Sequence, residues 1–256
     1  MMSKVRAAKP LVHHITNYVT VNDCANICIC AGGSPVMTDE YEDLRDMVKL
    51  ASAVVINIGT LNSRTVASMV AAGETANAEG KPVILDPVGV GATPYRNHVA
   101  RILFDNVRFS VIKGNAGEIG ILAGVGGQVR GVDSVSGGDG TAAKELAKIS
   151  GAIVGMTGET DYVSNGERTL ALSNGHSLMD RVSGTGCMAS SVVGCYVGAC
   201  GASLESVASG ISAFTIAGEL AAKKSSGPGT FKANLFDSLY GLTPEQAQKA
   251  LKCSEL

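Results

Sequence analysis

The sequence predicts an α/β fold in which a central, mostly parallel β-sheet is flanked by helices. Short, nearly continuous apolar runs alternate with amphipathic segments, and each apolar run ends in a glycine or a polar residue. Continuous apolar runs are typical of parallel strands that are covered on both faces. Their alternation with helical segments predicts strand–helix–strand units with right-handed crossovers.

The predicted elements follow one another along the chain. Buried strands are expected at residues 53–59, 82–87, 109–115 and 152–158, with amphipathic helices at residues 63–78, 95–104 and 141–149. A β-hairpin is expected within residues 162–172, because Ser164-Asn165-Gly166 is a typical turn sequence. From Cys187 onward the chain is expected to be mostly helical, with a break at residues 225–229.

Length and composition narrow the class of protein. A chain of 256 residues without a linker or repeat is expected to form one domain, residues 1–256. The net charge of −2 argues against a nucleic-acid or membrane-surface partner. No apolar run reaches about 18 residues, and no signal peptide is expected, because no apolar segment follows the basic residues Lys4 and Arg6. The seven cysteines contain no Cys-x-x-Cys pair, which favours free thiols and a cytoplasmic location.

A glycine-rich segment, Arg-Val-Ser-Gly-Thr-Gly-Cys at residues 181–187, leads into an apolar stretch of small residues. This pattern predicts a turn followed by a helix N-terminus, whose free N–H groups and dipole suit a phosphate or a developing anion. Gly184 and Gly186 allow the backbone to approach a ligand closely. Cys187 is expected in the first turn, where the helix dipole should lower the pKa of its thiol.

Other interpretations of this segment stay open. The glycines are also compatible with tight turning or close packing alone. Residues 184–189 match a relaxed dinucleotide pattern, Gly-x-Gly-x-x-Ala, which would indicate an oxidoreductase. That pattern normally follows the first strand of its unit, whereas this one lies late in the chain. A P-loop is absent, so a nucleotide phosphate must be held in another way.

Polar side chains gather where the predicted strands end. In an open parallel sheet these ends share one edge, which is where ligands bind. Asp86 could bind Mg²⁺ or anchor a loop, and Lys113 could pair with a phosphate or be an ordinary solvated lysine. Glu118 could face a metal through water, or it could form a capping box with Asn115. The hydroxyl of Thr157 suits a turn or a nucleotide.

These features belong to a pattern that extends over nearly the whole chain. The sequence closely resembles the hydroxyethylthiazole kinase family, whose members have the three-layer ribokinase-like fold. The resemblance runs from Ile15-Thr16-Asn17 to Gly227-Pro228-Gly229-Thr230-Phe231. The intermediate blocks that agree are Ser34-Pro35-Val36-Met37, Asn57-Ile58-Gly59-Thr60-Leu61, Leu85-Asp86-Pro87-Val88-Gly89, Lys113-Gly114-Asn115-Ala116-Gly117-Glu118 and Thr157-Gly158-Glu159.

The resemblance implies phosphorylation by ATP of the primary alcohol of 4-methyl-5-(2-hydroxyethyl)thiazole, with Mg²⁺ as cofactor. It also implies a homotrimer with sites at the subunit interfaces. The residues that it assigns to the thiazole are Asn17, Met37 and Gly184, to ATP Lys113 and Thr157, and to Mg²⁺ and phosphate Asp86 and Glu118. The turn of Gly184, Thr185 and Gly186 corresponds to the anion hole of the family, and Cys187 lies beside it.

Two positions bear on how close this resemblance is. The family commonly has arginine where this chain has Lys113, and lysine lacks the planar fork that binds phosphate with two hydrogen bonds. Most ribokinase-like enzymes carry an aspartate base at the position of Cys187, whereas thiazole kinases carry cysteine. Cys187 is therefore expected to orient the alcohol and to act only weakly as a base. A kinase of another small alcohol, such as hydroxymethylpyrimidine, and a non-catalytic nucleotide-binding protein remain alternatives.

Overall fold

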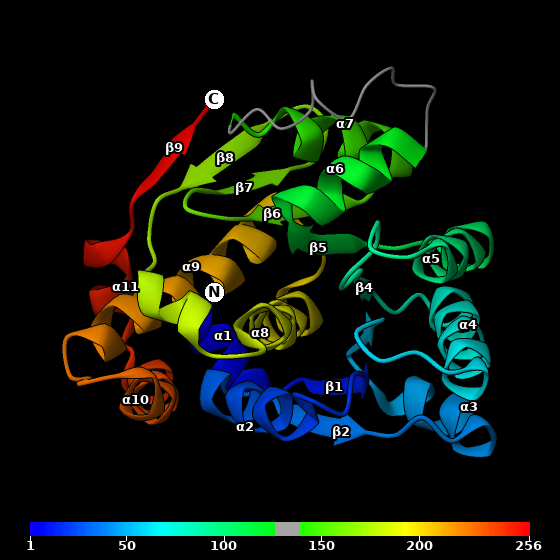
Figure 1. Ribbon diagram of the computed structural model, residues 1–256. Helices are drawn as coiled ribbons and strands as arrows, with labels where there is room; N and C mark the ends of the chain where they lie inside the picture. Colours follow the sequence, from blue (N-terminus) through cyan, green and yellow to red (C-terminus); the bar gives the residue numbers. More distant parts are fainter. Residues whose placement is uncertain (126–138) are drawn as a thin grey trace.

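The computed structural model describes residues 1–125 and 139–256 (Figure 1). The described strands are β1 Leu11–Ile15, β2 Ser34–Met37, β3 Ala53–Asn57, β4 Val83–Asp86, β5 Val111–Asn115, β6 Ile153–Thr157, β7 Asp161–Ser164, β8 Thr169–Leu172 and β9 Cys253–Glu255. They form one sheet in the order β2-β1-β3-β4-β5-β6-β7-β8-β9. Strands β1 to β6 are parallel to one another, and β7, β8 and β9 each pair antiparallel. The predicted mostly parallel sheet is confirmed.

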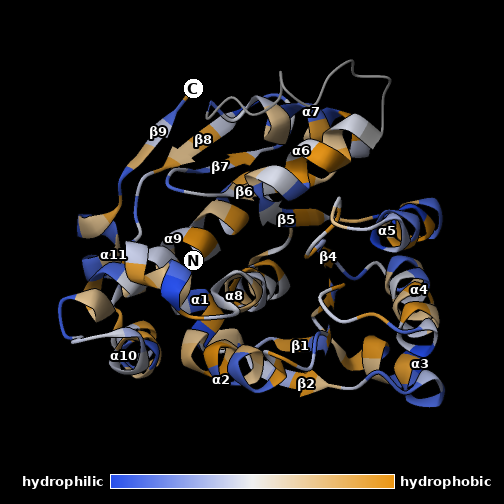
Figure 2. Ribbon diagram, in the orientation of Figure 1, coloured by the Kyte–Doolittle hydropathy of each residue, from blue (hydrophilic) through white to orange (hydrophobic). Residues whose placement is uncertain are grey.

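Helices cover both faces of this sheet and make a three-layer structure. The described helices are α1 Met2–Ala8, α2 Val21–Ala31, α3 Tyr41–Leu50, α4 Ser63–Ala78, α5 Pro94–Asn106, α6 Ala116–Val125, α7 Thr141–Ser150, α8 Thr185–Cys200, α9 Leu204–Ala222, α10 Pro228–Gly241 and α11 Pro244–Ala250, with a 3₁₀ helix at Ser177–Arg181. Helices α3 to α7 enclose one hydrophobic core against the sheet, and α1, α2, α8, α9 and α10 enclose the other. Figure 2 shows apolar residues along the strands and polar residues on the outer sides of α3 and α4.

Local sequence signals explain most of these boundaries. Helix α4 begins after Asn62, whose side chain accepts from the backbone N–H of Thr65 in a capping box. Helix α5 begins with Pro94 after the cap residue Thr93. Both helices lie where the amphipathic pattern predicted them. Across the described ranges, no helix combines the length and the apolar character needed to cross a membrane.

Three short strands were not predicted from the sequence. Strand β1 contains two histidines, which interrupt the apolar run, and β2 is four residues long and contains a proline. Strand β9, near the C-terminus, is polar and exposed. Pairing to a neighbouring strand, rather than local propensity, forms these elements.

The order of the strands creates a topological switch point. Strand β2 is added on one side of β1, and the next strand in the chain, β3, is added on the other side of β1. Right-handed crossovers therefore place α2 and α3 on opposite faces of the sheet. Ligands of open α/β sheets bind at such a point, outside the carboxyl ends of the strands. The ends of β1 and β3 therefore mark the expected site.

The pleat of the strands also decides which polar side chains meet. Val55, Ile84, Val111 and Val163 belong to the core under α8 and α9. Since side chains two residues apart point to the same face, the positions two residues away lie on that face as well. These are Asn57, Asp86, Lys113 and Asp161, on β3, β4, β5 and β7. A row of buried polar groups therefore crosses the sheet under the start of α8.

Candidate active site

The thiol of Cys187 lies at the switch point, in the first turn of α8. The side-chain amide of Asn17 donates to its Sγ over 3.3 Å, and the amide of Asn57 donates to it over 3.2 Å. Asn17 follows β1 and Asn57 ends β3, so the ends of two neighbouring strands hold the sulfur. The structure thus brings together Cys187 and Asn17, which the sequence assigned to the same site.

The expected lowering of the Cys187 pKa is wrong. Burial, followed by the negative charge of Asp86, raises the pKa of this thiol, although Thr20, Asn57 and Lys113 act in the opposite direction. Cys187 is only 8% exposed, and desolvation disfavours the thiolate. At neutral pH the group is therefore mostly a thiol, which suits positioning better than strong base catalysis.

Asp86 connects this thiol to a buried lysine. Its Oδ2 accepts from the Asn57 amide over 2.8 Å and from the Ser190 hydroxyl over 2.7 Å. Its Oδ1 lies 3.9 Å from Nζ of Lys113, and the two side chains are 2% and 3% exposed, respectively. Nζ of Lys113 also donates to the carbonyl of Gly186 over 2.9 Å. Lys113, which the family resemblance assigns to ATP, thus lies directly beneath the first turn of α8.

The start of α8 is shaped by Gly184, which has a left-handed backbone with φ of 86°. The first regular bond of the helix runs from the N–H of Met188 to the carbonyl of Gly184 over 2.8 Å. The N–H groups of Thr185, Gly186 and Cys187 precede this bond and have no acceptor in the part of the chain that the structure describes. They form the free helix start that the sequence predicted, and the helix dipole makes it favourable for an anion.

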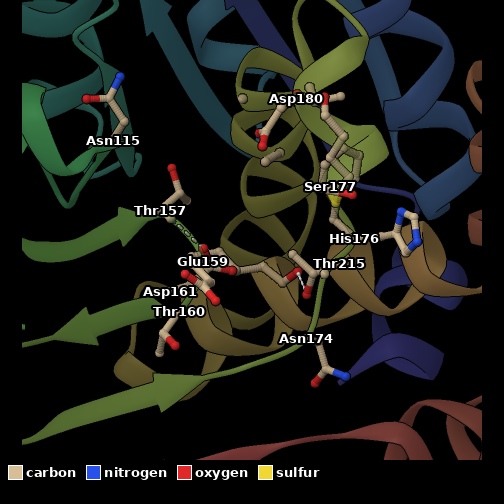
Figure 3. Close-up of a pocket in the computed structure, with 18 of the residues that line it drawn as sticks. Asn115, Thr157, Glu159, Thr160, Asp161, Asn174, His176, Ser177, Asp180 and Thr215 are labelled. Carbon is tan, nitrogen blue, oxygen red and sulfur yellow. Dashed lines mark hydrogen bonds between the residues drawn. The ribbon is translucent and has the colours of Figure 1, made fainter. Parts of the chain in front are cut away.

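A cavity of about 820 Å³ opens on the other side of this helix start (Figure 3). Its wall is formed by the ends of β5 and β6, the β6–β7 turn, the segment 173–180 and α9. Asn115, Thr157, Thr185 and Gly186 are among its lining residues. The described lining residues include the carboxylates of Glu159, Asp161 and Asp180 but no lysine or arginine. The charge of a bound phosphate would therefore be offset by the helix start and by accompanying cations.

One wall of the cavity is tied to the C-terminus. Asn174 donates to the carbonyl of Ala250 over 2.9 Å and to Glu219 over 3.1 Å, and it accepts from the N–H of Lys252 over 2.8 Å. Lys252 lies directly before β9, which closes the sheet against β8. The last strand and the cavity wall thus share one side chain.

Glu118 forms the capping box that the sequence offered as an alternative. Its carboxylate accepts from the N–H of Asn115 over 2.8 Å, and Oδ1 of Asn115 accepts from the N–H of Glu118 over 2.9 Å. The same carboxylate accepts from the N–H of Gly89 in the loop after β4, over 2.8 Å. Glu118 therefore fixes the loop that follows Asp86. Its assignment to Mg²⁺ remains a prediction.

Met37 lies apart from this network, at the carboxyl end of the edge strand β2, where it pairs with His14 of β1. It is half-buried, as is the rest of β2. Thr157 ends β6, and its hydroxyl donates to the carbonyl of Gly114 over 3.3 Å. The structure thus separates a β1–β2 side, with Met37 and Asn17, from a β5–β6 side, with Thr157 and the cavity.

Several important residues were not identified from the sequence. In the sequence, Asn57 was marked only as the first residue of one of the blocks that match the family. Arg96, at the start of α5, donates to the carbonyls of Ile58, Gly59 and Val88 over 2.6–2.8 Å. It thereby joins the loops after β3 and β4, which carry Asn57 and Asp86. No sequence signal marks such a residue, because its partners are backbone atoms of distant loops.

Asp161 is a buried carboxylate with one unused oxygen. Its Oδ1 accepts from the N–H of Gly158 over 3.0 Å, whereas Oδ2 has no hydrogen-bond partner in the described structure. The side chain lines the cavity and is 3% exposed. Burial raises its pKa from 3.8 to about 6, although the Gly158 hydrogen bond and the charge of Lys113 oppose the shift.

We expect Asp161→Asn to stabilise the ligand-free protein at pH 8 by about 1–2 kcal/mol. The raised pKa corresponds to a free-energy penalty of about 3 kcal/mol on the ionised folded state. Asparagine removes this penalty, but its buried amide is imperfectly hydrogen-bonded, so the net gain in stability is smaller. The penalty is full above pH 6 and fades as the pH falls towards 4, because the folded protein then takes up the proton. Urea denaturation at pH 8 and at pH 4 measures the free energy of unfolding of the variant and of wild type at each pH.

Asp46→Asn is the control for this comparison, because the Asp46 side chain is 84% exposed. It should leave stability close to that of wild type at both pH values. Equal stabilisation by Asp161→Asn at pH 8 and pH 4 would show that ionisation of this carboxylate does not lower the stability of the folded protein.

Comparisons with known proteins agree with this architecture. The sequence model of the Hydroxyethylthiazole kinase family matches residues 2–245. The hydroxyethylthiazole kinase of Methanoculleus marisnigri is 51% identical over 96% of this chain and 88% of its own, and that of Methanocella arvoryzae is 48% identical over 98% and 96%. The solved structure of the Pyrococcus horikoshii hydroxyethylthiazole kinase superposes with a TM-score of 0.93 at 41% identity, covering 100% of this chain and 97% of its own.

A more distant comparison supports the fold assignment alone. A ribokinase-like protein of Enterococcus faecalis superposes with a TM-score of 0.66 at 14% identity, over 93% of this chain and 88% of its own. The central parallel sheet, the switch point and the two helical layers are thus those of the ribokinase-like fold. The family match over most of the sequence carries the narrower assignment, and this chain belongs to the hydroxyethylthiazole kinase family.

Proposed function

We propose that the protein transfers the γ-phosphoryl group of ATP to the primary alcohol of 4-methyl-5-(2-hydroxyethyl)thiazole. Within the family, the observation that best supports this reaction is the position of the α8 start. Gly186 faces the cavity, while the next residue, Cys187, holds its thiol in the Asn17–Asn57 network. A single helical turn with free N–H groups thus lies between a nucleotide-sized cavity and a polar acceptor site.

This geometry suits phosphoryl transfer, which depends mainly on positioning and charge stabilisation. The N–H groups of Thr185, Gly186 and Cys187 would hold negative charge on the transferred group. The sulfur of Cys187 would orient the alcohol. Because the pKa of this thiol is raised, little thiolate is present at neutral pH to take the hydroxyl proton. The proton would pass late in the transfer, to an oxygen of the phosphoryl group or to water, so no strong base is needed.

The nucleotide would occupy the cavity beside Thr157, with its phosphates towards the α8 start and Lys113 beneath them. Lys113 reaches the phosphate side through its contact with Gly186. Its ammonium group would therefore attract the phosphates as a single positive charge from beneath the turn. It would not form the two parallel hydrogen bonds that an arginine can make.

Asp86 and Glu118 are the residues that we assign to Mg²⁺. The described residues contain no cluster of three or more acidic, histidine or cysteine side chains that could enclose a metal. Mg²⁺ bound to a nucleotide needs only one or two carboxylates, because water and phosphate supply its other ligands. The Glu118 carboxylate accepts from the N–H of Gly89, three residues after Asp86, so the sparse pair fits this mode. When bound, Mg²⁺ would neutralise charge on the β- and γ-phosphates.

The thiazole would bind on the β1–β2 side, against Asn17, Met37 and Gly184. In the described structure no strand pairs with the outer edge of β2, and its four residues are half-buried. An edge of this kind is open to another subunit, which supports a homotrimer with shared sites. The seven cysteines are free, in keeping with a cytoplasmic enzyme.

The direct test is ADP release with Mg-ATP and hydroxyethylthiazole, compared with hydroxymethylpyrimidine, pyridoxal and ribose. We expect turnover that is selective for the thiazole alcohol. Faster turnover of hydroxymethylpyrimidine would favour the alternative kinase on the same fold. Stabilisation by ATP without turnover of any acceptor would favour a non-catalytic nucleotide-binding protein.

A further inference from the structure

Two amides enclose the sulfur of Cys187. Nδ2 of Asn17 donates to Sγ of Cys187 over 3.3 Å and to Oδ1 of Asn57 over 3.0 Å. Nδ2 of Asn57 donates to the same Sγ over 3.2 Å and to Oδ2 of Asp86 over 2.8 Å. Both amides are buried. The sulfur thus meets two hydrogen-bond donors in a space that excludes most water.

The orientation of each amide follows from neighbours that can only donate. The oxygen and nitrogen of an asparagine side chain have similar shapes, so the surrounding bonds decide which is which. Oδ1 of Asn57 accepts from the backbone N–H of Gly59 over 2.9 Å, and Oδ1 of Asn17 accepts from that of Thr20 over 3.1 Å. Since a backbone N–H cannot accept, both NH₂ groups must face the sulfur.

The network therefore assigns a role to the sulfur. With two N–H donors directed at it, Sγ acts as an acceptor and keeps a fixed place between α8 and the strand ends. Hydrogen bonds to the thiolate lower its pKa, so Asn57 partly offsets the effects of burial and of Asp86. Asn57 is the only described side chain that bonds both Asp86 and Cys187.

The two oxygens of Asp86 also divide between two sides of the site. Oδ2 is taken up by Asn57 and Ser190, whereas Oδ1 faces Lys113 on the phosphate side. Asn57 thus reaches the acceptor side, and it neither lines the cavity nor forms a hydrogen bond with Lys113 among the described contacts. Its loss should affect the reacting alcohol more than the binding of the nucleotide.

We propose that Asn57 is a positioning residue for phosphoryl transfer: its amide, oriented by Gly59 and Asp86, fixes the Cys187 sulfur in the position from which the thiol orients the substrate alcohol. This inference rests on the proposed kinase function. It adds to that function a residue that acts through Cys187 and does not itself touch the reacting atoms.

The first test titrates the Cys187 thiol and needs no turnover. Asn57→Asp keeps the shape of the side chain but removes the donor, and Asn57→Leu removes it without adding charge. We expect the alkylation rate of Cys187 by iodoacetamide at pH 8, resolved by peptide mass spectrometry, to fall about 10-fold in either variant. That change corresponds to the loss of one hydrogen bond of about 1.4 kcal/mol.

Ser190→Ala is the matched control. Ser190 is buried and bonds the same oxygen of Asp86, but no bond joins it to the sulfur. Its alkylation profile should stay close to that of wild type. An unchanged profile in both Asn57 variants, or an equal change in Ser190→Ala, would overturn the positioning role.

Kinetics then test the consequence for the reaction. Displacing a reacting group by about 1 Å can lower a rate about 100-fold. We expect kcat to fall 10- to 100-fold in the Asn57 variants, with the KM for ATP within about threefold of wild type. Wild-type kcat with a raised KM for ATP would refute the inference. If wild type lacks activity but the titration responds as expected, the kinase proposal fails while the contact between Asn57 and the thiol stands.

Discussion

Gly184→Ala is expected to lower kcat by about 100- to 1,000-fold, the range typical of losing an anion-stabilising donor. Two effects of the new methyl group combine. Gly184 has φ of 86°, which an alanine adopts only under strain, and its Cβ would collide with Cγ2 of Thr20. Thr20 is buried and bonds Asn17 through both its N–H and its hydroxyl. The collision therefore displaces the α8 start and the amide network together.

The same helix supplies the control. Gly201, at the other end of α8, has φ of 83°, and a Cβ there would meet no atom within 4 Å. Gly201→Ala should therefore add only backbone strain of about 1–2 kcal/mol and keep its activity. ADP release and urea denaturation of both variants separate the collision from the strain.

A second substitution identifies the colliding atom. Thr20→Ser removes Cγ2 but keeps the hydroxyl that bonds Asn17. In the Gly184→Ala background it should restore activity at least 10-fold. If Gly184→Ala alone retains wild-type kcat, the α8 start does not act as the anion site.

Asp86→Asn is expected to destabilise the protein by about 3–5 kcal/mol, as is typical when one partner of a buried ion pair is removed. The Lys113 ammonium would remain buried, with the Gly186 carbonyl as its hydrogen-bond acceptor and Asp161 as the remaining nearby charge. Activity should be lost as well, because Asp86 holds Asn57 and is our candidate for Mg²⁺. Urea denaturation and ADP release measure the two effects.

A double mutant separates the stranded charge from the other roles of Asp86. Lys113→Met in the Asp86→Asn background removes the unpaired ammonium, so stability should recover by about 2 kcal/mol without recovery of activity. Glu145→Gln breaks an exposed pair with Lys148 and should leave stability nearly unchanged. Additive destabilisation by the two core substitutions would show that Asp86 and Lys113 do not form a coupled pair.

Much of the fold could be predicted because its signals are local. Helix α4 begins and ends at the predicted residues, and strands β3 to β6 lie inside the predicted apolar runs. The hairpin of β7 and β8 forms around the predicted turn. Strands β1, β2 and β9 were missed because partners distant in sequence stabilise them.

The site divides in the same way between local and tertiary causes. The free helix start at Gly184 was predicted, since a glycine turn before an apolar helix is a local pattern. The pKa of Cys187 was predicted in the wrong direction, because burial and the charge of Asp86 arise from other parts of the chain. Asn57 could not be recognised, since its role depends on the register that sets β3 beside β4. The assignments of Met37, Thr157 and Glu118 to ligands remain predictions.

The bond between Asn174 and the last strand has a thermodynamic consequence. A short, exposed strand such as β9 opens locally at little free-energy cost. Because Asn174 accepts from Lys252 and also lines the cavity, opening of β9 removes a partner from the cavity wall. A ligand that needs this wall in place binds the form with β9 paired more tightly than the form with β9 open. Ligand binding in the cavity should therefore slow hydrogen exchange of the backbone amides near the C-terminus.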